Sequence, residues 1–210
     1  EKLIIIFIII NLPIIIFYRQ VTNKINIFDH YDGVRKLHKN KVPLFGGILL
    51  IYNIVLFSLI DYFLNLNFNN HFLNTREYVS FFGGLLMCFL VGLYDDKFNL
   101  SPLKKLFLNL FIILTVILID DNLVIKSLSF SFLDNPIELE NISNFFTILC
   151  VLLFINALNM FDGINFQAAV YSIVVLILIF LKNIYSFYSL ILIFTLCLFL
   201  FYNFKNKNFL

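Results

Sequence analysis

Residues 141–161 read NISNFFTILCVLLFINALNMF, and this stretch decides the class of fold. It is apolar and free of charge, and about 20 such residues in a helix cross the roughly 30 Å hydrocarbon core of a bilayer. The whole chain has the same character, since 61% of its 210 residues are hydrophobic, 13% are charged and the mean hydropathy is +0.94. A soluble domain is about half apolar and a quarter charged. The composition and the net charge of +2 therefore exclude a water-soluble enzyme, a disordered region and a nucleic-acid-binding protein.

Charge-free runs on either side of residues 141–161 predict further spans. They are Leu3–Tyr18, Val42–Ile60, Tyr78–Tyr94, Leu106–Ile119, Gly163–Leu181 and Asn183–Phe204. The shortest run reaches span length when Leu103, Lys104 and Lys105 form its first turn, because lysine side chains snorkel to the membrane surface. A backbone in lipid must satisfy its own hydrogen bonds, so each span is helical. We therefore predict an all-α, polytopic membrane bundle of about seven helices, forming one integral-membrane domain over residues 1–210.

Lysines and arginines between the spans predict the orientation, because cytoplasmic loops carry more of them. If the spans alternate in direction, one face has only Lys2, Arg76, Lys126 and Lys182. The other face has the remaining 11 of the 15 basic residues and is predicted to be cytoplasmic. The N-terminus of this chain and residues 120–140 then lie outside. Alternation across Leu123–Phe132 predicts a short strand or hairpin in that outer segment.

Two adjacent carboxylates, Asp95 and Asp96, follow the run Tyr78–Tyr94 on the predicted cytoplasmic side. An Asp near lipid is expensive, and adjacent carboxylates repel unless a cation is close. The alternative is a solvated loop, with Ser101 as the N-cap of the next helix and Pro102 as its first residue. That alternative explains the Ser-Pro pair but not the Asp pair, so at this point the two interpretations are equally good.

Asn156, Asn159 and Asp162 follow one another at intervals of three, which puts them on one face if their helix continues. Asn and Asp oxygens are hard ligands that suit Mg²⁺. Gly163 then permits a backbone conformation that other residues avoid. The alternative is an Asn-rich turn between two membrane helices. The number of polar side chains that enter the apolar run favours a binding site.

Gly46 and Gly47 lie at the start of a predicted span that follows a basic loop. A phosphate or lipid head group can approach the backbone at such a glycine-rich helix start. A glycine-rich helix start behind a positively charged anchor is an equally good interpretation. Lys104 and Lys105 follow closely behind the Asp pair. Carboxylates, amides and lysines at a membrane surface suit phosphate chemistry on a lipid. Mg²⁺ would bridge a pyrophosphate, lysines would neutralise its oxygens, and a carboxylate would accept a proton.

Three motifs in this order and spacing resemble the polyprenyl-phosphate N-acetylhexosamine-1-phosphate transferases. They are Pro43-Leu-Phe-Gly-Gly47, Gly92-Leu-Tyr-Asp-Asp96 and Ile155-Asn-Ala-Leu-Asn-Met-Phe-Asp-Gly-Ile164. The resemblance implies transfer of a sugar-1-phosphate from a UDP-N-acetylhexosamine to undecaprenyl phosphate, with release of UMP. It implies a protein of the bacterial inner membrane, surrounded by the lipid bilayer, with its active site on the cytoplasmic face. It implies no nucleic-acid partner and is compatible with a homodimer. Mg²⁺ is the implied cofactor, and Mn²⁺ is its natural substitute.

The resemblance also implies roles for individual residues. The catalytic residues are Asp95, Asp96 and Asp162, and the metal ligand is Asn159. We assign substrate contacts to Lys105, Asn156, Gly46 and Gly47. Bacterial members often continue the last motif as Asp-Gly-Leu-Asp-Gly, whereas this chain has Asn165 and Phe166 at the final two positions. The eukaryotic dolichyl-phosphate relative shares the Asn, so activity is compatible with this departure.

Only Lys97–Leu100 separates the Asp pair from Ser101. This favours the UDP-GlcNAc branch over the phospho-MurNAc-pentapeptide translocase, which has a longer insert there. A transporter is the alternative from another class, but it would carry ionisable residues at mid-helix. A non-catalytic scaffold gives no reason for the Asp pair.

Family members continue with Gly-Asp-x-Gly, the principal metal motif, beyond the position of Leu210. We therefore expect these 210 residues to be a piece of a longer transferase, incomplete at both ends and inactive alone.

Overall fold

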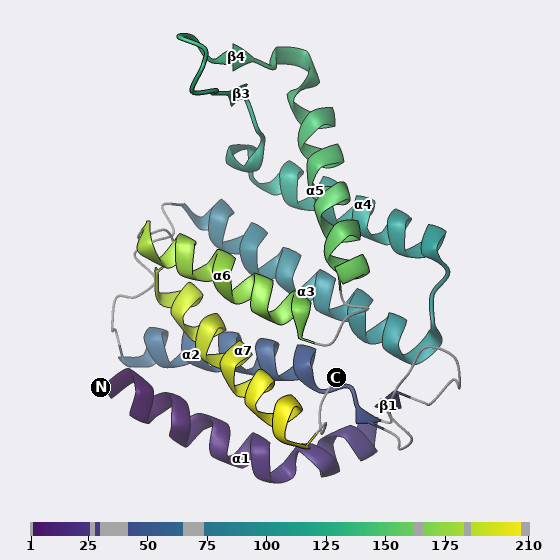
Figure 1. The fold of residues 1–210 in the computed structure, drawn as a ribbon, viewed down its shortest axis with the longest axis vertical. Helices are drawn as coiled ribbons and strands as arrows, with labels where there is room; N and C mark the ends of the chain where they lie inside the picture. Colours follow the sequence, from purple (N-terminus) through teal and green to yellow (C-terminus); the bar gives the residue numbers. More distant parts are fainter. Residues whose placement is uncertain are drawn as a thin grey trace. The chain divides into compact units, whose positions relative to one another are not determined.

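The computed structural model describes residues 2–25, 28–29, 42–64, 74–161, 166–182 and 186–206. The helices in this part of the chain are α1 (Lys2–Ile25), α2 (Gly46–Leu64), α3 (Thr75–Phe98), α4 (Pro102–Ile119), α5 (Ser143–Phe161), α6 (Gln167–Leu181) and α7 (Ser186–Asn206) (Figure 1). Six of them are long and apolar enough to cross a membrane, and α6 is a shorter apolar helix. The all-α membrane fold is therefore confirmed, and each predicted run contains one of these helices, although the run Val42–Ile60 begins with two residues of strand. The prediction of about seven spans is met by six helices of span length and one shorter helix.

Strands are short and lie outside the helices. β1 (Phe28–Asp29) pairs antiparallel with β2 (Val42–Pro43), and β3 (Ser127–Leu128) pairs antiparallel with β4 (Ile137–Glu138). Two short 3₁₀ helices, η2 (Asp121–Leu123) and η3 (Glu140–Ile142), flank the second pair. The predicted strand within residues 123–132 is confirmed, but its partner strand lies further along the chain.

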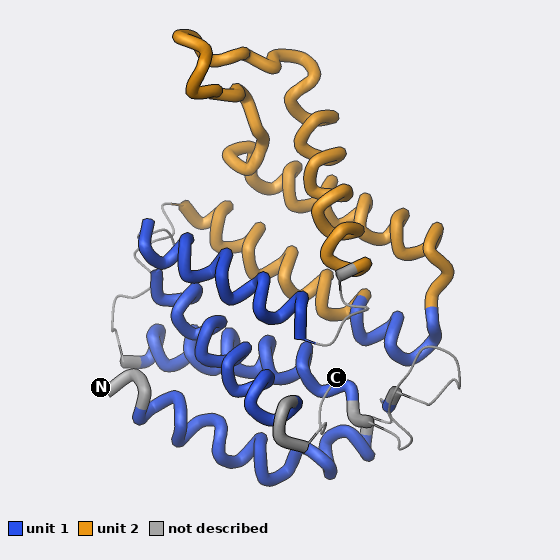
Figure 2. Tube along the Cα trace, in the orientation of Figure 1, with its two compact units in different colours: residues 1–71, 92–99, 166–210 blue, residues 72–91, 100–165 orange. Residues whose placement is uncertain are grey.

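The chain forms two compact units, each built from segments that are distant in sequence (Figure 2). Unit 1 consists of residues 1–71, 92–99 and 166–210, and unit 2 of residues 72–91 and 100–165. Helix α3 is shared, because its last turns belong to unit 1 and the rest to unit 2. The expectation of one integral-membrane domain stays a prediction.

In unit 1, α7 packs against α6 and α2, and α1 packs against α2. Buried apolar side chains fill these contacts. They include Phe45, Leu49, Phe57 and Ile191, each at most 2% exposed. A hydroxyl contact also joins two of the helices, since the oxygens of Ser58 on α2 and Tyr188 on α7 lie 3.3 Å apart. The unit therefore combines apolar packing with a few buried polar links between helices.

The most complete of these links is an amide pair formed by Asn11 on α1 and Asn53 on α2. Each amide nitrogen donates to the other residue's side-chain oxygen, at 2.8 and 2.9 Å. The second proton of each amide goes to a carbonyl one turn back in its own helix, that of Phe7 or Leu49, at 2.9 Å. Both side chains are at most 1% exposed, so all four amide protons are satisfied away from water. The pair joins the two helices at a fixed register.

Replacing one Asn of this pair by Leu is expected to destabilise the protein more than replacing both. Asn11→Leu or Asn53→Leu leaves the remaining buried amide without its partner, at a cost of about 1–3 kcal/mol. The double variant removes both polar groups, and pairs of this kind contribute on average only about 0.6 kcal/mol in a membrane protein. Thermal unfolding of the four proteins in detergent measures the coupling. A double variant whose loss equals the sum of the single losses would contradict the reciprocal pair.

Unit 2 joins α3, α4 and α5. A Cβ atom added to Gly84 on α3 would lie 2.9 Å from Cγ2 of Val116 on α4, so the glycine permits a close approach of these helices. The Thr147 hydroxyl on α5 accepts a hydrogen bond from the backbone N–H of Ile125 at 2.9 Å. That bond anchors the segment between η2 and β3 to α5. Helix α4 also packs directly against α5.

Candidate functional site

The helix end that carries the Asp pair is set by Asn99. Its backbone adopts a left-handed conformation with φ of 49°, and its N–H donates to the carbonyl oxygen of Asp95 at 2.7 Å. Asn is one of the residues that tolerates this conformation at a helix C-terminus. The next helix begins at once, with Ser101 as the N-cap and Pro102 as the first helical residue, as predicted. The Ser101 side chain makes no capping hydrogen bond, so the proline contributes the helix start.

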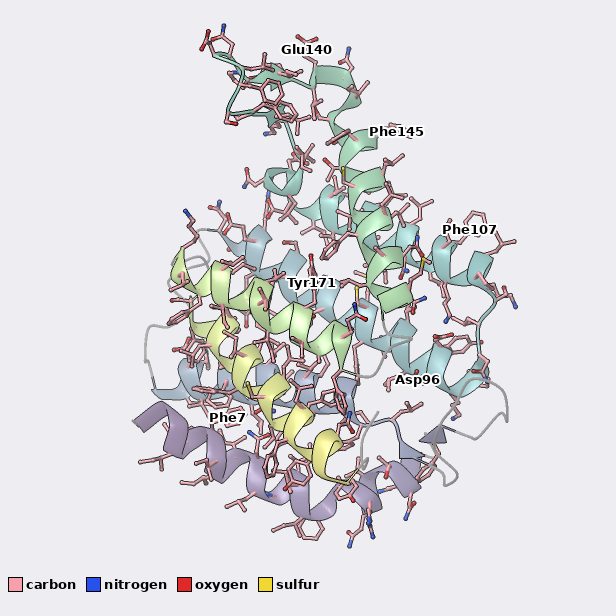
Figure 3. All side chains as sticks on the ribbon, viewed as in Figure 1. Phe7, Asp96, Phe107, Glu140, Phe145 and Tyr171 are labelled. Carbon is pink, nitrogen blue, oxygen red and sulfur yellow. The ribbon has the colours of Figure 1, made fainter. Side chains whose placement is uncertain are left out.

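Asp95 and Asp96 lie in the last turn of α3, where Asp95 is half-buried and Asp96 is exposed. Figure 3 labels Asp96 at this end of the helix. Successive residues in a helix point about 100° apart, so the two carboxylates face different directions. Both add negative charge to the end of the helix that already carries the negative partial charge of the dipole. Lys97, in the same turn, lies over the Phe98 ring, with its nitrogen 5.7 Å from the ring centre. The end of α3 thus attracts a cation.

The start of α4 has the opposite character. Lys104 is exposed and Lys105 half-buried in its first turn, which is the positive end of that helix dipole. The Lys105 backbone N–H donates to the Ser101 carbonyl at 3.1 Å, as expected of the first helical hydrogen bonds. Two ammonium groups at a helix N-terminus favour an anion there. This arrangement suits a phosphate or pyrophosphate ligand.

Helix α5 continues through both asparagines of the third motif and ends at Phe161. Asn156 and Asn159 therefore share a face, which confirms the condition set by their spacing, and both side chains are exposed. Their amide oxygens lie near the negative end of the α5 dipole, so both the ligand chemistry and the local field suit Mg²⁺. Asp162 and Gly163 lie outside the described residues. Among the residues that are described, no group of three or more His, Cys, Asp or Glu is arranged to hold a metal.

Gly46 and Gly47 begin α2 in unit 1. A Cβ atom added to Gly46 would lie 2.8 Å from Cε2 of Phe199 on α7, so this glycine is needed for packing of the helix start. Gly47 is exposed at the same positive helix end. The assignment of both glycines to substrate binding stays a prediction, and Gly46 has a structural role in addition.

The candidate residues are divided between the two units. Unit 1 contains Gly46, Gly47, Asp95 and Asp96, and unit 2 contains Lys105, Asn156 and Asn159. Within unit 1, the Asp pair lies on α3 and the two glycines on α2. Within unit 2, the helix that carries Lys105 packs against the helix that carries both asparagines. The structure thus brings the α4 and α5 contributions onto neighbouring helices.

Phe166 reveals a local strain that the sequence did not signal. It is the N-cap of α6 with φ of 69°, and its carbonyl accepts the first hydrogen bond of that helix from Val170 at 2.9 Å. A left-handed conformation costs a non-glycine residue about 1–2 kcal/mol. The family that this sequence resembles often has Gly at this position of the motif. The departure at Phe166 therefore has a cost in backbone energy.

We expect Phe166→Gly to be more stable than Phe166→Ala, by about 1 kcal/mol. Both variants remove the ring, but only Gly adopts the left-handed backbone conformation without strain. The difference in stability between the two variants therefore measures the free energy cost of that conformation. At most positions the alanine variant is the more stable of the two, because Gly loses more chain entropy on folding. Thermal unfolding of both variants in the same detergent measures the difference. An alanine variant as stable as the glycine variant would argue against strain at this position.

Comparison with known proteins assigns the family. Residues 78–209 match glycosyl transferase family 4, a range that includes Asp95, Asp96, Lys105, Asn156, Asn159 and Asp162. The chain is similar to the undecaprenyl-phosphate alpha-N-acetylglucosaminyl 1-phosphate transferase of Escherichia coli (strain K12), with 29% identity over 150 residues that make up 71% of this chain and 37% of the relative.

The protein of the same name from Salmonella typhimurium is 31% identical over 147 residues, which are 70% of this chain and 36% of the relative. The aligned part is thus little more than a third of the length of these relatives. The family match covers more than half of the chain, and six of its described helices are long and apolar enough to cross a membrane. We conclude that the chain is a multi-pass membrane protein that belongs to glycosyl transferase family 4.

Proposed function

We propose that the protein to which this chain belongs transfers N-acetylhexosamine-1-phosphate from a UDP-sugar to undecaprenyl phosphate, releasing UMP. The bacterial relatives carry a name that states the undecaprenyl-phosphate acceptor and the sugar 1-phosphate transfer. The proposed setting is the bacterial inner membrane, with the site on the cytoplasmic side. The proposed cofactor is Mg²⁺, for which Mn²⁺ can substitute.

The observation that carries the proposal is the charge at four helix ends. The ends of α3 and α5 have carboxylates and amide oxygens at the negative ends of their dipoles, which favours a cation. The starts of α2 and α4 have glycines and lysines at the positive ends, which favours phosphate oxygens. If successive spans alternate in direction, as the sequence predicts, these four ends would face the same side of the membrane. A cation and a pyrophosphate are the two ligands that such a transfer requires.

The side chains have separate tasks in the proposed reaction. Lys105, with the exposed N–H groups at the start of α4, holds the phosphate oxygens of the sugar nucleotide. One carboxylate of the Asp pair orients the lipid phosphate and accepts its remaining proton, which is held with a pKa of about 6 in a phosphate monoester. Asn159 would hold Mg²⁺, and the bound ion would neutralise the charge that develops on the leaving UMP. Asn156, on the same face of α5, would contact the sugar nucleotide.

The test uses the full-length protein in bacterial membranes. We expect UMP release from UDP-GlcNAc and a lipid-linked product, and both should require added undecaprenyl phosphate and a divalent cation. Membranes with the same amount of the double variant Asp95→Asn/Asp96→Asn provide the matched control. UDP-MurNAc-pentapeptide is offered in parallel, since its use would identify the peptidoglycan translocase instead. UMP release that does not depend on the lipid, or no lipid-linked product from either donor, would refute the proposal.

A further inference from the structure

A polar pocket lies in unit 2, where α3 begins and α4 ends. Its volume is about 610 Å³, which is within the range of small-molecule sites. The residues that line it include Asn74, Thr75, Arg76, Asp120, Asp121 and Lys126. None of them belongs to the candidate site described above. The pocket lies at the opposite end of α3 from Asp95 and Asp96.

The two helix ends put this pocket at the level of the lipid head groups. Thr75 is the first residue of the span α3, and Asp120 directly follows the last residue of the span α4. At about 1.5 Å per residue, the 24 residues of α3 measure about 36 Å, enough to cross a hydrocarbon core of roughly 30 Å. Residues at both of its ends therefore lie where lipid meets water. A molecule abundant at that boundary is the natural occupant of the pocket.

Asp120 gives the pocket a buried negative charge. The residue is 2% exposed, and its Oδ1 accepts the backbone N–H of Asn122 at 3.1 Å. Its own N–H donates to the Val116 carbonyl at 3.1 Å, so Asp120 ends α4 and begins η2. Within the described part of the chain, the carboxylate has no other hydrogen bond and no ion pair. A buried carboxylate with one neutral donor is poorly compensated, which favours a cationic N–H donor in the pocket.

Arg76 and Lys126 give the same pocket a positive side. Both are exposed, and neither forms an ion pair with a carboxylate among the residues that the structure describes. Arg76 lies in the first turn of α3, where backbone N–H groups and the helix dipole already favour an anion. The pocket thus contains two carboxylates, those of Asp120 and Asp121, and two cationic groups, and no ion pair joins them among the described residues. A ligand with both charges would satisfy both sides.

We propose that this pocket binds the head group of a zwitterionic phospholipid that carries a primary ammonium, as in phosphatidylethanolamine. The phosphodiester accepts hydrogen bonds from Arg76, Lys126 and the N–H groups at the start of α3. The ammonium donates to the free oxygen of Asp120, and Asp121 adds negative charge beside it. A quaternary ammonium has no N–H to donate, and an anionic head group brings no cation to Asp120. The inference is independent of the proposed transferase activity.

The test measures which lipid the full-length protein retains. The purified, delipidated protein is offered equal mixtures of phosphatidylethanolamine, phosphatidylcholine and phosphatidylglycerol with the same acyl chains, and bound lipid is identified by native mass spectrometry. A chelator is present throughout, so that no divalent cation occupies the carboxylates. We expect the ethanolamine lipid to be bound about tenfold more than either of the others, the scale of one charge-assisted hydrogen bond. Soluble phosphoethanolamine should compete with it.

Two variants connect the preference to the pocket. Asp120→Asn keeps an oxygen that can accept the Asn122 N–H and removes the charge, so the preference over phosphatidylcholine should disappear. Arg76→Gln changes an exposed side chain and should reduce binding of the ethanolamine lipid, which tests the pocket even if Asp120→Asn is too unstable to purify. Asp134→Asn, an exposed change outside the pocket, is the control and should keep the preference. Equal retention of all three lipids, or a preference unchanged in both variants, would overturn the proposal.

Discussion

At least one of the variants Asp95→Asn and Asp96→Asn is expected to lower the rate of sugar-1-phosphate transfer by about 100-fold or more. Asn keeps the size of the side chain and removes both the charge and the ability to accept a proton. Asp95 is half-buried and Asp96 exposed, and the two point in different directions from α3, so the two losses should differ in size. The measurement is the turnover rate of the full-length protein at saturating lipid and sugar nucleotide.

The matched control for this pair is Asp134→Asn, which changes an exposed carboxylate near the β3–β4 hairpin. It should retain normal turnover. All three variants are compared at equal amounts in the membrane, so that loss of folding is not mistaken for loss of catalysis. Near-normal turnover for both Asp95→Asn and Asp96→Asn would mean that the pair only ends a helix in a solvated position.

Asn159→Ala in the full-length protein is expected to lose most of its activity while still inserting into the membrane. If the amide oxygen is a metal ligand, its removal should cost several kcal/mol of transition-state stabilisation and raise the Mg²⁺ concentration needed for half-maximal activity. A titration of activity with Mg²⁺ measures both effects. Activity within about threefold of the unchanged protein corresponds to under 1 kcal/mol and would exclude this role.

Two other asparagines of α5 serve as comparisons for that variant. Asn144 is exposed at the opposite end of the helix, so Asn144→Ala should behave like the unchanged protein. Asn156 shares the face of Asn159, and we assign it to the substrate rather than to the metal. Asn156→Ala should therefore raise the KM for the sugar nucleotide without changing the Mg²⁺ requirement. The same shift in Mg²⁺ requirement for both variants would indicate that the two amides hold the metal together.

The sequence predicts the helices well because lipid leaves the backbone few alternatives. A charge-free run of span length must be largely helical, and each such run contains a helix in the structure. The ends are harder to predict, since they depend on single residues. The run at Tyr78–Tyr94 continues as α3 through the Asp pair to Phe98, because Asn99 rather than the charge of the aspartates stops the helix. An Asn shortly before Ser-Pro was the available signal.

The candidate residues could be chosen from the sequence, but their surroundings could not. Spacing alone predicts that Asn156 and Asn159 share a face, because that relation is local to one helix. The contact of Gly46 with Phe199 joins residues far apart in the chain, and neither position signals it. From the sequence, Asp120 is only one residue of a predicted outer segment, and its burial and its place in a pocket with Arg76 and Lys126 single it out. Long-range contacts of this kind require coordinates.

The amide pair between Asn11 and Asn53 also bears on how the protein is made. During synthesis α1 leaves the ribosome before α2, and at that stage the Asn11 side chain has only its bond to the Phe7 carbonyl. Release of α1 alone into lipid would leave the other amide proton and the amide oxygen without partners, which hydrocarbon penalises. Release of both helices together as a hairpin satisfies the two amides at once. The insertion machinery should therefore hold α1 until α2 arrives, and these two helices should enter the bilayer as one unit.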